Sequence, residues 1–134
     1  MITIKTTVNA PITKVWECWT QPQHITQWNH ASDDWHTPKA SNDLKIGGTF
    51  CATMASKDGA MSFDFEGTYT AVKEFALIKY VMADGRKVNI TFEETPMGIT
   101  VTESFDPESQ NPEEMQRQGW QNILDNFKKY TEIK

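Results

Sequence analysis

Cysteine, clusters of basic residues and long apolar runs are the features that this sequence has least of. Its two cysteines, Cys18 and Cys51, lie far apart without metal-type spacing, so we expect free buried thiols in a reducing cytoplasm. No Lys/Arg cluster exceeds a pair and the net charge is −5, which argues against nucleic-acid binding. No stretch is apolar enough to cross a membrane, and the N-terminus lacks signal-peptide features. We therefore expect a cytoplasmic protein that binds neither nucleic acid nor membrane.

The composition is that of one globular domain. Hydrophobic residues make up 38% of the 134 residues and charged residues 23%. This length supports one hydrophobic core and is too short for two. Because there is also no linker, repeat or low-complexity segment, we predict a single domain over residues 1–134.

The first 28 residues predict one strand and two short helices. Apolar residues alternate over positions 2–8, as in a strand. Pro11 suits the first position of a helix, and the apolar positions 12, 15, 16 and 19 then form one helical stripe. Pro22 begins a second helix that presents Trp28 to the core.

The middle of the chain predicts an antiparallel meander. Residues 29–46 are polar and irregular, with a short edge strand around Trp35. Further strands are predicted from Gly47 to about Ser56, and over residues 61–71, 75–82, 88–92 and 99–105. Apolar and polar residues alternate along the second of these, as in a sheet with one buried face. Tight turns join the strands, so neighbours in sequence should pair.

The last helix has the clearest signals. Asn111 is a good N-cap, Pro112 fits the first position and Glu114 completes a capping-box-like pattern. Apolar residues from Met115 to Ile133 cover about half of the helix circumference. A helix on a flat sheet needs a stripe of only about 100°. We therefore predict an α+β fold in which a curved sheet surrounds this helix.

Several segments together resemble one superfamily. They are NAP at residues 9–11, VWECWT at 15–20, Pro22, Trp28, DLKIGGTF at 43–50, FEGTY at 65–69, VNITFEE at 88–94 and GWQNILDNFKKY at 119–130. Their order and spacing resemble the START-like, or SRPBCC, superfamily, in the branch of homologues of the activator of heat-shock-chaperone ATPase. The resemblance implies the helix-grip fold, with a cavity between the sheet and the C-terminal helix. Its members include lipid carriers, polyketide cyclases and chaperone activators, so fold alone does not determine function.

The resemblance leaves three functions open. The first is non-catalytic binding, without a cofactor, of a small apolar or aromatic molecule that is lipid-like or polyketide-like. The second is a cyclase- or dehydratase-type enzyme acting on a polyketide-like substrate. The third is a co-chaperone-like module that contacts a chaperone. We prefer the first, because the sequence contains no nucleophile–base motif, no phosphate loop and no convincing acid–base pair.

The candidate ligand site combines aromatic walls with a few polar groups. The candidates are Trp28, Trp35, Phe50, Phe63, Phe65, Tyr69, Phe92, Gln116, Trp120, Ile123 and Phe127. The segment 28–36 should close one end of the curled sheet and border the cavity near Gln116 and Trp120. Its two indoles are large amphipathic surfaces that suit the mouth of a pocket.

Three histidines and one glutamate are the remaining candidate chemical groups. His24, His30 and His36 recur every six residues, a spacing that shares no face of a helix or strand, so we expect no metal site. Glu103 has the parity of the inward-facing Val101, but a buried carboxylate is costly unless it is paired. We therefore expect a bulge or the strand end to turn Glu103 outward; an inward Glu103 would mark function.

Overall fold

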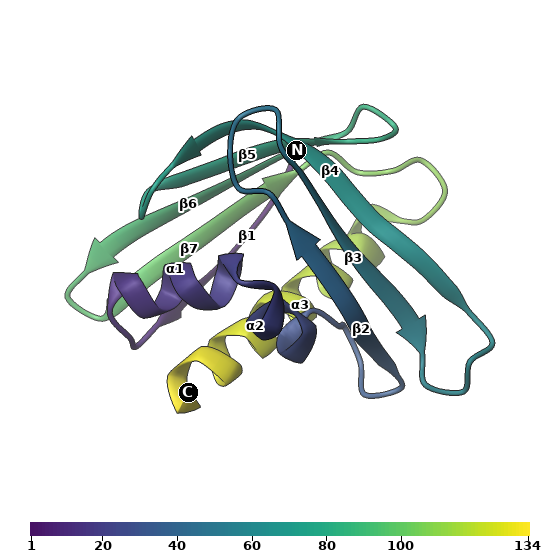
Figure 1. Ribbon diagram of the computed structural model, residues 1–134, viewed down its shortest axis with the longest axis horizontal. Helices are drawn as coiled ribbons and strands as arrows, with labels where there is room; N and C mark the ends of the chain where they lie inside the picture. The colour runs from purple at the N-terminus through teal and green to yellow at the C-terminus, as the bar shows by residue number, and fades with distance from the viewer.

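Seven strands and three helices make up the computed structural model, which describes residues 1–134 (Figure 1). They are β1 (Ile2–Val8), α1 (Ile12–Thr20), α2 (Pro22–Trp28), β2 (Trp35–Asn42), β3 (Thr49–Ser56), β4 (Ser62–Lys73), β5 (Leu77–Met82), β6 (Lys87–Thr95), β7 (Gly98–Phe105) and α3 (Glu113–Ile133). This confirms the predicted α+β class. None of the helices is long and apolar enough to span a membrane.

All seven strands form one antiparallel sheet, in the order β1-β7-β6-β5-β4-β3-β2. Strands β2 to β7 are a meander, as the tight turns predicted. Strand β1 pairs instead with β7, which makes β1 and β2 the two edges. The sheet curls around α3, while α1 and α2 lie on the same side of it (Figure 1). The predicted helix-grip arrangement is therefore confirmed.

Helix α3 is held to the β1 edge by side chains that reach its backbone. Arg117, Gln121 and Lys128 donate to the carbonyl oxygens of residues 3, 5 and 7, at 2.9, 3.3 and 2.7 Å. Alternate carbonyls of an edge strand point outward and need partners. The helix supplies them from one face, because residues about four apart lie above one another. This row of bonds fixes how α3 crosses the sheet.

The hydrophobic core lies between the concave face of the sheet and the three helices. Leu124 and Phe127 of α3 are fully buried in it. The apolar stripe of α3 is narrower than predicted at its ends, because Met115 and Ile133 are 61% and 87% exposed.

Two local predictions need correction. Strand β2 is a full edge strand of eight residues, with a register shift between His36 and Lys39, rather than a short strand in an irregular segment. Asn111 does not cap α3, which begins at Glu113 after Pro112 and has no side-chain cap. The Asn111 backbone N–H donates instead to Glu108 at 2.7 Å, which keeps this residue in the preceding loop.

Candidate ligand-binding pocket

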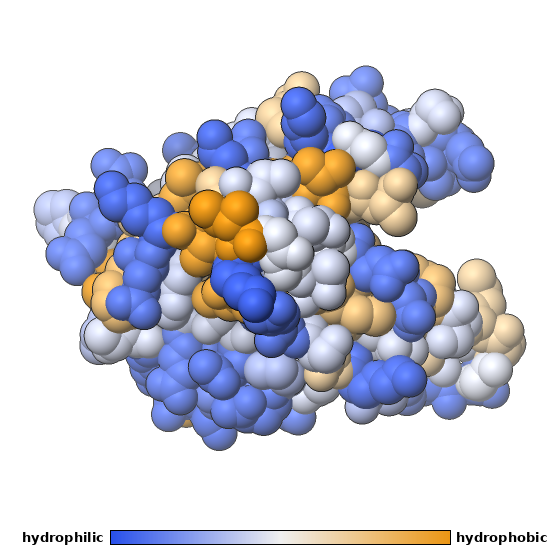
Figure 2. Space-filling view, turned by 45° about the horizontal axis from the view of Figure 1, so that its top comes forward, coloured by the Kyte–Doolittle hydropathy of each residue, from blue (hydrophilic) through white to orange (hydrophobic).

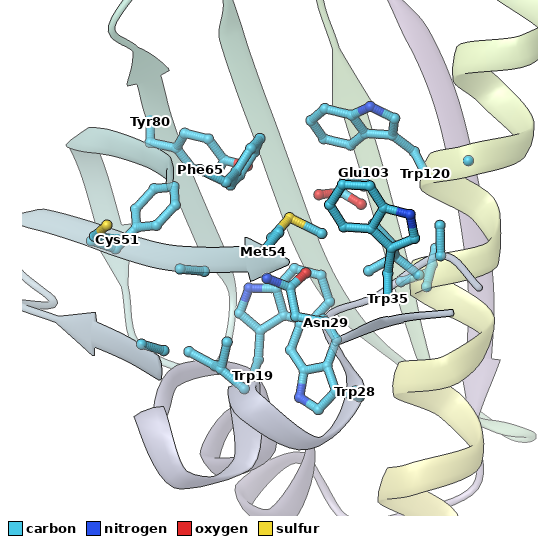
Figure 3. Close-up of a pocket in the computed structure, with 18 of the residues that line it drawn as sticks. Trp19, Trp28, Asn29, Trp35, Cys51, Met54, Phe65, Tyr80, Glu103 and Trp120 are labelled. Atoms are coloured by element: carbon cyan, nitrogen blue, oxygen red, sulfur yellow. The ribbon is translucent and has the colours of Figure 1, made fainter. Parts of the chain in front are cut away.

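A pocket of about 400 Å³ opens between α3, the concave sheet face and the connection from α2 to β2 (Figure 3). Eighteen of its 23 lining residues are hydrophobic. Ligand pockets in proteins have this combination of size and apolar lining. The pocket is therefore the natural candidate for a functional site.

The structure brings eight of the eleven candidate residues to this pocket. They are Trp28, Trp35, Phe50, Phe63, Phe65, Tyr69, Trp120 and Ile123. The segment after α2 also borders it, through Asn29, Ala31 and Ser32. Gly119 and Trp120 of α3 belong to the same lining, and Asn126 of α3 donates to the carbonyl oxygen of His30 at 2.6 Å.

Phe92 and Phe127 lie outside the lining, in the packed core under α1 and α2. The Phe92 ring meets Trp16 edge-on at 5.2 Å between centroids. Phe127 packs edge-on against Trp19 and Trp28, at 4.8 and 4.9 Å. Helices α1 and α2 thus fill one end of the space that α3 and the sheet enclose.

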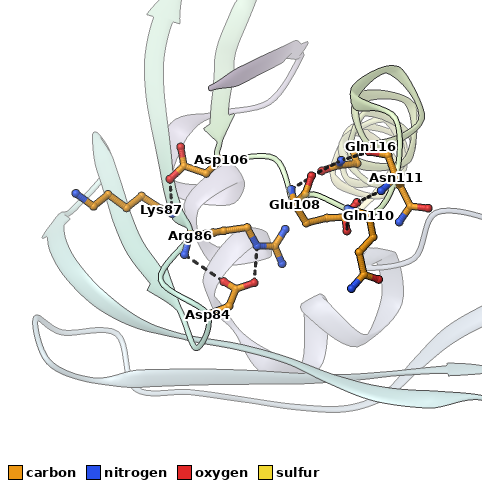
Figure 4. A network of polar contacts seen from close by, with 8 residues as sticks. All are labelled: Asp84, Arg86, Lys87, Asp106, Glu108, Gln110, Asn111 and Gln116. Atoms are coloured by element: carbon orange, nitrogen blue, oxygen red, sulfur yellow. Dashed lines mark hydrogen bonds and ion pairs between the residues drawn. The ribbon is translucent and has the colours of Figure 1, made fainter.

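Gln116 lies outside the lining as well, and holds the loop between β7 and α3 (Figure 4). Its side chain accepts from the Glu108 N–H at 2.9 Å and donates to the carbonyl oxygens of Glu108 and Asn111. The amide oxygen and the amide nitrogen of Gln116 are therefore both bonded to backbone groups. Its polar position in the apolar stripe reflects this role in the loop.

The mouth of the pocket is formed by the β2 edge and the β3–β4 hairpin. The Trp35 and Phe63 rings are 5.9 Å apart. Phe63 is 50% exposed and neighbouring Met61 61% exposed, because this hairpin extends past the helices. The space-filling view shows a notch in one side of the molecule (Figure 2). Large apolar groups at an accessible edge are suited to contact an entering molecule.

Trp120 helps to keep the pocket open. Its ring lies flat on Phe105 of β7, with centroids 3.9 Å apart and planes 9° from parallel. It therefore covers the wall of the sheet and does not reach across the space toward β2. The rings of Phe65 and Trp120 also pack edge-on, with centroids 5.9 Å apart.

Gly67 makes room for two aromatic side chains of the lining. A Cβ atom at this position would lie 2.9 Å from ring carbons of both Phe50 and Tyr80. Those rings meet edge-on, with centroids 4.6 Å apart, across the β3–β4–β5 part of the sheet. The glycine in the FEGTY segment is thus a packing requirement of the pocket floor.

Glu103 points into the pocket, so the expectation that it turns outward is wrong (Figure 3). Strand β7 pairs without a bulge on both sides, and Glu103 lies opposite Ile4 of β1 and Ile90 of β6. The regular register leaves it no way to the convex face. It is 7% exposed, and this burial raises the pKa of its carboxyl group to about 8.

Two buried tyrosines add hydroxyl groups to the lining. The Tyr69 hydroxyl donates to Asn42 Oδ1 at 2.6 Å, whereas no hydrogen bond holds the Tyr80 hydroxyl. Burial, followed by the charge of Glu103, raises the pKa of Tyr80 well above its ordinary value. Burial raises the pKa of Tyr69 as well. Both hydroxyls therefore stay protonated at neutral pH.

Sequence reasoning missed several lining residues. Trp19 lies on the apolar stripe of α1 and Tyr80 is an aromatic residue of β5, and neither pattern tells a pocket residue from a core residue. Small residues of β2 and β3, such as Ala40 and Ala52, widen the pocket and carried no signal that could have identified them. Cys51 is free and half-buried beside them, while Cys18 is free and fully buried.

The histidines do not share a site. His24 bonds the Tyr130 hydroxyl through Nδ1 at 2.6 Å and lies 3.6 Å from Glu17. His30 is half-buried in the segment after α2, and His36 lies on β2. No group of three or more His, Cys, Asp or Glu side chains is arranged to hold a metal ion.

Fold and pocket together define a protein of the helix-grip class. The family described as Activator of Hsp90 ATPase homolog 1-like protein matches residues 9–132, and the chain belongs to this family. The resemblance predicted from the sequence is therefore confirmed.

Solved structures agree with this assignment. An AHSA1-like protein from Aeromonas hydrophila is 45% identical, with 98% of this chain and 92% of that chain covered and a TM-score of 0.93. A protein from Cytophaga hutchinsonii is 56% identical over 98% and 92% of the two chains, with a TM-score of 0.85. One from Nitrosomonas europaea is 18% identical over 98% and 94%, with a TM-score of 0.85, and shows the fold alone. No curated protein matches.

Proposed function

We propose that this protein binds a small apolar or aromatic molecule, lipid-like or polyketide-like, without transforming it. The observation that carries the proposal is the pocket of about 400 Å³ with 18 hydrophobic residues among its 23. Interiors of this kind are normally filled by side chains. A pocket that an aromatic lining leaves open has the size and chemistry of a site for a drug-sized ligand.

The charged groups around the pocket favour binding over acid–base catalysis. Glu103 is the only Asp, Glu, His, Lys or Arg in the lining. No hydrogen bond joins its carboxyl group to a second titratable side chain. General acid–base chemistry normally places an acid and a base within reach of the same substrate. A single buried carboxyl group suits recognition better than the cyclase or dehydratase alternative.

Family membership favours a second candidate, which is contact with an Hsp90-type chaperone. Its test is the ATPase rate of a purified chaperone, measured with and without this protein. A rate that rises in proportion to bound protein, and that is insensitive to substitutions in the pocket, would support the chaperone function. An unchanged rate at saturating protein would count against it.

The binding function is tested by thermal shift with flavonoid-like, polyketide-like and fatty-acid compounds. A ligand present at about a hundred times its Kd adds about 2.7 kcal/mol to stability, which raises the Tm by several degrees. Binding should also change the tryptophan fluorescence, because four indoles line the pocket.

The matched variants are Trp35→Ala at the mouth and Met97→Ala on the β6–β7 turn. Met97 is 77% exposed and outside the lining, so its truncation should leave affinity unchanged. Trp35→Ala should weaken binding by about tenfold or more, because it removes a large contact surface. If no compound stabilises the protein, the binding proposal fails. If Trp35→Ala leaves the affinity of every hit unchanged, the pocket is not the site.

A further inference from the structure

The pocket has one polar end, and Glu103 and Tyr80 make it. Glu103 projects from the middle of β7 with isoleucines on both neighbouring strands, and its carboxyl group points toward the side of the pocket where Trp35 and Trp120 lie (Figure 3). Tyr80 comes from β5 and lines the same pocket, and the charge of Glu103 contributes to raising the pKa of its hydroxyl. Two polar groups from different strands therefore belong to one apolar lining.

Neither group has a partner in the protein. Glu103 is 7% exposed, and this burial raises the pKa of its carboxyl group. The nearby Tyr69 hydroxyl shows the contrast, because it is bonded to Asn42. The side-chain oxygens of Glu103 and Tyr80 are not among the fully buried polar atoms that lack a partner, which are His30 Nδ1 and Thr131 Oγ1. They therefore face the open space of the pocket, where a ligand can supply a hydrogen-bond partner.

We propose that Glu103 and Tyr80 bind an oxygen substituent, a carbonyl or a hydroxyl, on an otherwise aromatic ligand. The inference rests on the proposed binding function and adds the chemical class of the ligand. At neutral pH the Glu103 carboxyl group is mostly protonated, because its pKa is about 8. A neutral carboxylic acid and a phenol each donate one hydrogen bond and can accept another. They match a neutral oxygen, whereas a cationic ligand would require an ionised carboxylate.

Ionisation of Glu103 should therefore weaken binding of a carbonyl ligand. The other ionisable groups of the lining are Tyr69, Tyr80 and Cys51, and burial raises the pKa of each. The helices and β2 contribute no Asp, Glu, His, Lys or Arg to it. One pH unit above a pKa of 8, about a tenth of Glu103 keeps its proton. Affinity for a carbonyl ligand should thus fall about tenfold from pH 6 to pH 9.

The experiment compares probes that share a naphthalene ring, by fluorescence and calorimetry. They are 2-acetonaphthone, which carries a carbonyl, 2-ethylnaphthalene, which has no oxygen, and naphthylmethyl-trimethylammonium, a permanent cation. At pH 6 the wild type should prefer the ketone over the hydrocarbon about five- to tenfold, as one net hydrogen bond provides.

Variants separate the polar end from the rest of the pocket. Glu103→Leu should reduce the preference to about one while both probes still bind. Glu103→Gln should keep a preference but lose its pH dependence, because an amide does not ionise in this range. Tyr80→Phe should reduce the preference in part. Tyr130→Phe is the matched control, since this hydroxyl bonds His24 outside the lining and its loss should change nothing.

The outcomes separate this inference from the function on which it rests. If no probe binds, both fail. If the ketone and the hydrocarbon bind equally to the wild type, the pocket binds ligands but the polar end is not used. If the cation binds best, and more tightly as the pH rises, Glu103 acts as an ionised partner and the inference is wrong. A pH dependence that persists in Glu103→Gln would also overturn it.

Discussion

The space between α3 and the sheet has a filled end and an open end, although aromatic residues dominate both. Under α1 and α2, the rings of Trp19, Trp28 and Phe127 interlock at about 5 Å between centroids. Toward the β3–β4 hairpin, Trp120 lies flat against the sheet and small residues line β2 and β3. Aromatic content therefore does not decide whether an interior is solid. The orientation of the rings and the size of the residues facing them decide it.

The largest expected effect lies at the filled end. Phe127→Ala should lower the free energy of unfolding by about 3–5 kcal/mol, because it leaves a cavity among rings that cannot close over it. Phe63→Ala, at the open and half-exposed end, should cost less than about 1 kcal/mol. Urea melts of the two variants measure the contrast. Similar costs would show that the two ends do not differ in packing.

The pH dependence of stability should report on Glu103, the one carboxyl group in the lining of the open end. Burial raises the pKa of Glu103 in the folded state from 4.5 to about 8. The stability that its protonated form allows is therefore fully present below pH 4.5 and is lost as the pH rises through 8. At about 1.4 kcal/mol per unit, the loss between pH 5 and pH 9 should reach about 2–4 kcal/mol. Glu103→Gln should remove this slope from chemical melts. A slope that survives in the variant would have to come from another group.

Gly67 tests how tightly the floor of the open end is built. Gly67→Ala should cost about 1–3 kcal/mol, because the new methyl group would meet Phe50 and Tyr80 at 2.9 Å. It should also weaken ligand binding by displacing those rings. Thermal and urea melts test the first effect and titration with a bound probe tests the second. A neutral substitution would mean that the rings can shift without loss.

The smallest expected effect is a gain in stability at Gly119, the glycine of α3 that lines the pocket. A Cβ at Gly119 would meet no atom within 4 Å, and alanine favours a helix over glycine by roughly 0.5–1 kcal/mol. Gly119→Ala should therefore raise the Tm by a few degrees. A destabilised variant would show that the space beside this residue is not free.

The helices and strands were predictable because the spacing of apolar residues, two in strands and three to four in helices, agrees with the turn residues along most of the chain. The boundary between pocket and core was not predictable, because Phe92 and Phe65 both face inward and differ only in what the helices place against them. Glu103 teaches a related lesson. Its parity indicated an inward side chain, but the cost of burying a carboxylate argued for the reverse. Regular pairing of β7 with β1 and β6 keeps the side chain inward, and burial raises its pKa so that the carboxyl group is buried mostly in its neutral form.

The pairing of the first strand with the seventh also sets the order in which a newly made chain can fold. Thr3 and Ser104 share a hydrogen bond across 101 residues of sequence. At translation rates of about 5–20 residues per second, roughly 5–20 s pass between the synthesis of the two strands. Throughout that interval β1 lacks its partner strand β7, and α3, which holds the same edge, is made later still. The β1 edge of the sheet can therefore close only after β7 and α3 have been made, which gives this fold a slow, long-range step.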